Sequence, residues 1–479
     1  MNLRRTALAG AVLISGTLSY ALTTQELLQS IELSARNERA LSRDECVKLA
    51  QENNRLCKIS EYDVKIARAL LNQAKSAYWP SVSAGLVAGV MDEPLIFGYP
   101  ASTIPTDIPT STGPLEIDVP AQDIEMTGNS IVMASLNLKY YVYTGGIRPA
   151  INEQARYGVE YAEQGVRRTE QEVIYDVERA YYGAVLTRKL VKIADETLQR
   201  MEATLELTER LYQEGSGFVK KTDYLKNKTV VEVIRSIKSS METMQFKADT
   251  ALVNLTGLPR GTRIIPRDTE LPGDVPVPDA EQLIMQALDA NPQLAGVRAG
   301  IGAYSARVDE ARGSYKPKIG LFATYVHTYS ELDTGMMHPD NKNFIGVGVG
   351  AELPLFEGFR NKNRVLEVSL ELQKLQAQEN ALIEGIALLI QHAHAELASA
   401  QEREVSTGNG LRAAAENRDL NVRAYQQELV ETEDVIEAQF MEAFLDVNYQ
   451  KTLYEVIEAR ARLNMLVGSG SAPIDGGTF

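Results

Sequence analysis

The chain has 479 residues, of which 44% are hydrophobic and 24% are charged, and it carries a formal net charge of −15. This length is sufficient for two or three ordinary domains. The excess of acidic residues argues against nucleic acid as a partner and favours solubility in a water-filled compartment.

Residues 1–21 have the layout of a secretory signal peptide. Two arginines precede the apolar or small stretch 6–18, and Ser19–Ala21 ends in a small-x-small pattern, which predicts cleavage after Ala21. An uncleaved anchor is the alternative, but the apolar stretch is too short to span a bilayer comfortably. Beyond it the sequence has no apolar run of about 18 residues and therefore predicts no transmembrane helix. A membrane location would then require a β-barrel.

Cys46 and Cys57 are the only cysteines. In one straight helix they would lie about 16 Å apart, which is too far for a disulfide. A helix break at Asn53 and Asn54 would allow them to pair, and an exported protein meets an oxidising compartment. The sequence therefore leaves two hypotheses: the two cysteines form a disulfide, or they are separate thiols in the core.

An internal repeat is the most informative feature of the chain. Segment 74–82 lines up with 311–319 at an offset of 237, and Asn54 meets Asn291 at the same offset. Further matches follow in the same order: 143–148 with 355–360, 210–213 with 423–426, and Asp223 with Asp434. The predicted organisation is a signal peptide at 1–21, a first repeat at 22–258, a Pro-rich linker at 259–278, a second repeat at 279–467 and a tail at 468–479.

The distribution of proline predicts long helices. No proline occurs between Pro149 and Pro259 or between Pro354 and Pro473, and apolar residues recur there every three or four positions. The predicted helices are about 147–213, 222–258, 359–427 and 432–467. A helix of about 65 residues is about 100 Å long, which exceeds the width of a globular domain of this size. The helices must therefore project as coiled hairpins.

Four short segments alternate with a period of two, at about 80–91, 130–143, 317–329 and 344–356. This pattern suits a membrane barrel, and a soluble sandwich is the alternative. Four strands leave two open edges, which lipid does not tolerate, so membrane residence implies that several chains share one barrel. Segments 91–128 and 330–343 are predicted to be polar loops.

Together these features resemble the TolC-like outer-membrane efflux proteins, over nearly everything after residue 21. The markers are an Ala-x-x-x-Tyr-x-Pro motif at 74–80 and again at 311–317, the turn Phe-Glu-Gly-Phe-Arg at 356–360, and a reversal ahead of an Asp at each helix tip. The fold that the resemblance implies is mainly α with a membrane β-barrel. Three protomers, each a duplicated helix-strand-strand-helix repeat, would form a 12-stranded β-barrel continuous with a periplasmic α-helical barrel.

The resemblance also implies partners and an entrance gate. The partners are a homotrimer, outer-membrane lipid, a periplasmic adaptor and an inner-membrane pump of RND, ABC or MFS type. Thr222 and Asp223 would help to hold the tunnel closed, and Tyr425 matches a tyrosine that bonds to that aspartate. Asp434 and Glu437 match two carboxylates that ring the constriction. The expected adaptor contacts are Gly217, Phe218, Val219 and Lys220.

Two departures from the family pattern affect this gate. Val430 stands where the best-known relative has a gate arginine, so the interhelical salt link is absent, and Glu428 replaces the glycine of the second tip. Asp434 and Glu437 lie three residues apart on one helical face, so three copies would present six carboxylates, which favour cations. The alternative is an ordinary exposed acidic face. A Tyr425→Phe trimer is predicted to conduct ions better than the natural one.

The sequence predicts neither an enzyme nor a cofactor site. His392 and His394 point about 200° apart on a helix and cannot share a metal ion, while His327 and His338 lack convincing ligand neighbours. A phosphate-cradling Gly-rich lysine loop is also missing from the sequence. We therefore expect a passive exit duct of a tripartite efflux pump or a type I secretion system. The rival hypothesis is a periplasmic coiled-coil adaptor or scaffold with a small β-domain.

Overall fold

The structure is a computed structural model, and it describes residues 38–93, 96–111, 113–125, 128–215, 217, 219–273, 276, 279–330 and 343–468. The predicted signal peptide, Phe218 and nearly all of the predicted tail lie outside these ranges. The chain divides into two compact units, one comprising residues up to 58, 169–289 and 387 onward, the other comprising 59–168 and 290–386. Each unit draws on both sequence repeats. In the part of the chain that the structure describes, no helix is apolar over a stretch long enough to cross a bilayer.

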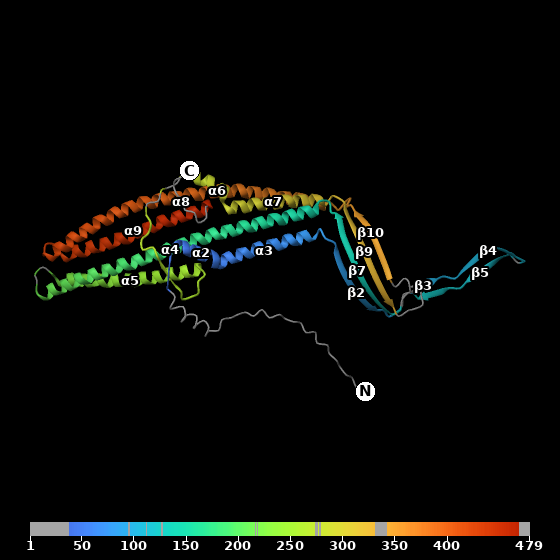
Figure 1. Cartoon of the computed structure of the whole chain (residues 1–479), viewed down its shortest axis with the longest axis horizontal. Coiled ribbons are helices and arrows are strands. Elements are labelled where there is room, and N and C mark those ends of the chain that lie inside the picture. Colours follow the sequence, from blue (N-terminus) through green and yellow to red (C-terminus); the bar gives the residue numbers. More distant parts are fainter. Residues whose placement is uncertain are drawn as a thin grey trace, which may run out of the picture. The chain divides into compact units, whose positions relative to one another are not determined.

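In the second unit, parts of four helices lie side by side in the order α3, α4, α7, α8 (Figure 1). Their bounds are Arg55–Ser76, Ile147–Gln213, Pro292–Gly313 and Arg360–Gln426. Side chains bridge neighbours in this order: Arg68 to Glu163 at 3.0 Å, Gln154 to Glu310 at 2.8 Å, and Arg307 to Glu371 at 3.3 Å. Helices α4 and α8 also continue into the first unit.

Each of these helices is joined to one strand of a four-stranded antiparallel sheet, in which the order is β10, β9, β7, β2. The strands are β2 (Ser81–Val90), β7 (Ser130–Tyr143), β9 (Lys318–Ser330) and β10 (Asn343–Glu352). Among the described strands, β2 and β10 pair on one side only. The expectation that the last strand reaches Phe356 is wrong: it ends at Glu352, because Pro354 has no N–H for a ladder hydrogen bond.

The expectation of a polar loop over 91–128 is also wrong. The segment contains two antiparallel ladders, β3 with β6 and β4 with β5. Their bounds are Ile96–Tyr99, Gln122–Glu125, Ser102–Thr110 and Gly113–Val119. Thr, Ile and Val favour extended pairing, and proline is tolerated because both strands of a two-stranded ladder are edges. The β4–β5 register shifts between Pro105 and Pro109.

The first unit contains the ends of two helical hairpins and a small α/β part. Helix α5 (Lys221–Leu255) follows α4, and α9 (Thr432–Val467) follows α8. Strand β1 (Glu38–Leu41) pairs in parallel with β8 (Arg263–Pro266), so the predicted linker contains a strand. The first unit also contains helix α2 (Arg43–Asn53) and nearly all of helix α6 (Ala280–Ala290).

The core of the first unit holds both cysteines. Helix α2 ends at Asn53 and α3 begins at Arg55, so the helix does break between them. Cys46 and Cys57 are nevertheless buried thiols rather than a disulfide, and they pack with Tyr181 and Leu252. Burial raises the pKa of the Cys46 thiol to about 12. Of the two alternatives left open by the sequence, the structure has the thiols.

The two turns from strand into long helix have similar backbone geometry. Helices α4 and α8 both have 67 residues and begin at residues 147 and 360, an offset of 213, whereas the motif alignment gave 212. The structure therefore pairs Gly145 and Gly146, with φ of 68° and 90°, with Gly358 and Phe359, with φ of 60° and 65°. A phenylalanine thus adopts the left-handed conformation that glycine supplies in the first repeat.

Candidate functional site

The two hairpins reverse at tips with the same backbone geometry. Gly215 has φ of 74° three residues after Tyr212, and Glu428 has φ of 57° three residues after Tyr425. The Leu429 N–H donates to the Ala424 carbonyl at 2.9 Å, which closes the second reversal. Glu428 therefore occupies a left-handed position that an L-residue rarely adopts.

This pairing predicts opposite effects of exchanging the two residues. Glu428→Gly is expected to keep or raise the free energy of unfolding, because relief of about 1–2 kcal/mol of left-handed strain offsets the added chain entropy. Gly215→Ala introduces the same strain and is expected to lower the free energy of unfolding by about 1 kcal/mol. Urea unfolding followed by circular dichroism measures both. A loss of stability in Glu428→Gly equal to that in Gly215→Ala contradicts the assignment.

The two aspartates matched by the repeat have the same local role. The Lys220 N–H donates to Asp223 at 2.9 Å, and the Glu431 N–H donates to Asp434 at 3.0 Å. Each aspartate is the third residue of its helix, where a carboxylate satisfies a free N–H and interacts favourably with the positive end of the helix dipole. The Thr222 hydroxyl also donates to Asp223, at 3.2 Å. Both carboxylates are therefore held in fixed positions at the tips.

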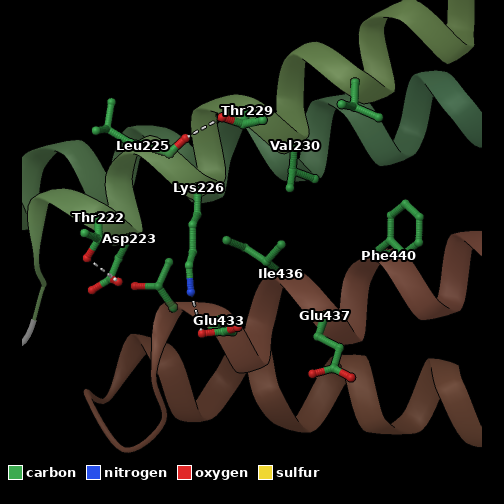
Figure 2. Close-up of a pocket in the computed structure, with 12 residues that line it drawn as sticks. Thr222, Asp223, Leu225, Lys226, Thr229, Val230, Glu433, Ile436, Glu437 and Phe440 are labelled. Carbon is green, nitrogen blue, oxygen red and sulfur yellow. Dashed lines mark hydrogen bonds and ion pairs between the residues drawn. The ribbon is translucent and has the colours of Figure 1, made fainter.

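A groove of about 780 Å³ runs between the first turns of α5 and α9 (Figure 2). Val230, Ile436 and Phe440 form apolar parts of its lining, and Glu437 belongs to the lining as well. Figure 2 shows Lys226 extending from α5 to Glu433 on α9, and the two charged groups are 2.8 Å apart. This hydrogen bond raises the pKa of the Lys226 ammonium. The ion pair joins the two hairpins at their tips.

A buried chain of hydrogen bonds links all four helices beside this groove. The Tyr425 hydroxyl lies 3.0 Å from the hydroxyls of both Thr208 (α4) and Thr432 (α9), and Asn227 (α5) donates to Thr208 at 3.3 Å. These four side chains are at most 3% exposed. Buried polar groups that are hydrogen-bonded specify one packing arrangement. These hydrogen bonds therefore fix how the two helical hairpins pack against each other.

Two further polar layers continue along α4 and α9. Gln439 donates to Thr204 at 3.1 Å. Glu442 then lies 3.1 Å from Arg200 of α4 and 3.3 Å from Arg418 of α8, with only 13% of its side chain exposed. The contact between α4 and α9 near the tip is therefore largely polar, whereas α4 and α5 share the apolar cluster of Leu198, Met201, Val231 and Ile234.

Comparison with known proteins assigns the family. The sequence profile of the outer membrane efflux proteins matches residues 46–258 and 283–469, which is well over half of the chain. The chain belongs to the outer membrane efflux protein family. As a member, it is an outer-membrane protein of the TolC-like type, with its helical part in the periplasm.

Individual relatives are distant. Protein CyaE of Bordetella pertussis is 23% identical over 271 residues, which cover 56% of each chain. Alkaline protease secretion protein AprF of Pseudomonas aeruginosa is 25% identical over 220 residues, 45% of this chain and 43% of AprF. The chain thus spans about half of the length of these relatives. The CmeC outer membrane channel of Campylobacter jejuni has the same fold, with a TM-score of 0.72 and 14% identity over 99% of this chain and 95% of CmeC.

Within this efflux-protein fold, the structure brings most of the predicted gate residues to the hairpin tips. Tyr425 is buried against threonines, whereas Asp434 and Glu437 are exposed on one side of α9. Of the expected adaptor contacts, Gly217 and Lys220 are exposed and Val219 is only 6% exposed. Phe218 lies outside the described residues.

Sequence reasoning missed Lys226, Glu433, Thr208, Asn227, Gln439 and Glu442. A usable signal was present, because Arg200, Thr204 and Thr208 are spaced by four and therefore form a polar stripe on one face of α4. Two oppositely charged residues on different helices, such as Lys226 and Glu433, leave no such signal in a single sequence.

The family and fold are those of channels rather than enzymes. His327 Nδ1 lies 2.8 Å from the Asn343 side-chain oxygen, and His338 is outside the described residues. Within the described ranges, no three His, Cys, Asp or Glu side chains are placed to hold a metal ion.

Proposed function

We propose that three copies of this chain form the exit duct of a tripartite efflux pump or a type I secretion system. In this proposal, β2 of one copy pairs with β10 of the next, and twelve strands close a barrel that continues into a helical tunnel. The support is the open sheet of the single chain. Each of its two outer strands is paired on one side only among the described strands. Lipid does not tolerate an unpaired strand edge.

The side chains of the sheet favour a barrel over a soluble sandwich. On β10, Ile345, Val347 and Val349 form one face and are 70–80% exposed, while the alternating positions 346, 348 and 350 are glycines. On β2, Leu86 is 73% exposed. A sandwich buries its apolar face against a second sheet, whereas a membrane barrel turns that face to lipid.

In this proposal the hairpin tips gate the duct. Asp434 and Glu437 of three copies form a ring of six carboxylates at the entrance, which favours cations. The latch comprises Tyr425, with Thr208 and Thr432 around its hydroxyl, and the Asp223–Thr222 pair at the first tip, which the family resemblance links to Tyr425. The Lys226–Glu433 ion pair compensates in part for the arginine that Val430 replaces.

Transport is passive in this proposal, and the energy comes from an inner-membrane pump that a periplasmic adaptor couples to the tips. Gly217, Phe218, Val219 and Lys220 remain the proposed adaptor segment, with Gly217 and Lys220 as its exposed members. The family description names efflux and the name of AprF refers to protease secretion, so both small molecules and polypeptides are proposed cargo. The adaptor rival is disfavoured because adaptors typically carry one hairpin, and this chain has two.

Channel activity tests this function directly. The full chain, purified in detergent from outer membranes and added to a planar lipid bilayer, is expected to give discrete single-channel current steps. Absence of current steps from protein that fractionates with the outer membrane and keeps its helical circular dichroism would contradict the proposal.

A further inference from the structure

A groove of about 230 Å³ lies where β10 leads into α8, in the second unit. Its lining includes the apolar or aromatic side chains of Tyr315, Leu355, Phe356 and Phe359, the cations Arg360 and Lys362, and the carboxylate of Glu357. Leu355, Phe356 and Phe359 are 89%, 74% and 65% exposed. Three adjacent large apolar side chains this exposed indicate a contact surface.

Phe359 is held there at the expense of backbone strain. Its φ of 65° is left-handed, and the structurally equivalent residue of the first repeat is Gly146. The Phe359 ring packs edge-on against Phe356, with ring centroids 5.5 Å apart, and not into the core. Backbone strain of this kind is usually found where a side chain has a function. The side chain here is the Phe359 ring, which forms an exposed aromatic pair with Phe356.

The cations of the groove distinguish between the partners that could cover it. Arg360 is 73% exposed although it pairs with Glu357 at 2.7 Å, and Lys362 is exposed at the same turn. In the proposed trimer, the segment that leads into β2 of the next copy would lie closest. That segment, 73–80, contains Lys75 and no carboxylate, so its charge is not complementary.

We infer that this groove binds a glycerophospholipid of the periplasmic leaflet, with the phosphate at Arg360, the positive charge of Lys362 in the same groove, and the acyl chains against Phe356 and Phe359. Arginine and lysine bind phosphate through charge-assisted hydrogen bonds, and aromatic side chains concentrate at the membrane interface. The inference rests on the outer-membrane location and not on the gate. It places the junction of strand and helix at the height of the lipid headgroups.

Native mass spectrometry of the full chain in mild detergent, with added dioleoylphosphatidylglycerol, tests the inference. The natural chain is expected to retain bound lipid. In the R360Q/K362Q variant, the fraction of chains that carry lipid is expected to fall about tenfold. Lys374→Gln is the control, because it removes one positive charge about 20 Å further along α8, at a residue that does not line the groove. Equal occupancy in all three proteins overturns the inference, as does an equal loss in the control.

Phe359→Gly separates binding from folding, because glycine accepts φ of 65° without strain. We expect this variant to keep the natural melting temperature or exceed it while lipid occupancy falls. Unchanged occupancy overturns the role of the ring. If inorganic phosphate added alone remains bound and the lipid does not, the site is a phosphate site and the lipid is excluded. If the variants lose oligomer mass instead of lipid, the groove is a contact between copies and the inference fails, while the proposed channel stands.

Discussion

A channel assembled from D434N/E437Q subunits is expected to lose most of its preference for cations over anions. A carboxylate about 8 Å from an ion in water contributes about 0.5 kcal/mol, so six of them contribute about 3 kcal/mol before salt screening. We therefore expect the permeability ratio of potassium to chloride to fall about tenfold, since a tenfold change corresponds to about 1.4 kcal/mol. Reversal potentials across a salt gradient in a planar bilayer measure this ratio.

The substitutions are chosen to remove charge without unfolding the tip. Asn at position 434 keeps an oxygen that accepts the hydrogen bond from the Glu431 N–H, which is 3.0 Å long in the natural chain. Glu206→Gln is the matched control, because Glu206 is exposed on α4 and pairs with Arg210 on the same helix. If the control lowers the ratio as much as the double variant, the ring of carboxylates is not what selects ions.

Tyr425→Phe is expected to raise the ion conductance of the isolated channel. The substitution removes the hydroxyl that lies 3.0 Å from both Thr208 and Thr432, in a site where Tyr425 is only 2% exposed. A neutral hydrogen bond contributes about 0.5–1.5 kcal/mol, so three copies that open together would lose about 2–4 kcal/mol of closed-state stability. That corresponds to a change on the order of 10- to 1000-fold in the open–closed equilibrium.

Tyr212→Phe is the natural control for this prediction, because the repeat makes Tyr212 the counterpart of Tyr425. Tyr212 is 39% exposed and stacks on Tyr224 with ring centroids 6.3 Å apart. We expect the conductance of the Tyr212→Phe channel to equal that of the natural channel. Conductance that is unchanged in Tyr425→Phe, or raised equally in both variants, would show that the buried hydroxyl does not hold the tips closed.

Long-range regularity made much of the fold accessible from the sequence. Proline-free windows with a repeating apolar pattern mark the long helices, since proline cannot occupy a helix interior and the pattern recurs over many turns. The prediction of a polar loop over segment 91–128 was wrong for a local reason. Its prolines, threonines and aspartates are typical of a loop, yet they lie in two-stranded ladders whose edges accept proline.

The sequence predicted a residue of the candidate site only where that residue matched a family motif or the internal repeat. Asp223 and Asp434 could be found because their positions at the helix tips recur in both repeats. Glu442 could not, because its importance comes from Arg200 and Arg418 on two other helices, and a single sequence does not show which helices pack together. Tyr425 lies near the second tip, and its threonine partners Thr208 and Thr432 depend on the same packing of helices.

If copies of this chain join β10 to β2 to close one barrel, a disulfide can be formed across that junction between two copies. Within one copy, β9 and β7 separate these strands by three spacings, about 14 Å, whereas a disulfide requires Cα atoms within about 7 Å. Val349→Cys, at a side chain that is 70% exposed, would be combined in turn with Cys at each position from Ser83 to Val87, in a C46A/C57A background. We expect that at least one pair of cysteines is oxidised and gives a covalent trimer on a denaturing gel. Only monomers at every position, from protein that also sizes as a monomer in detergent, would contradict it.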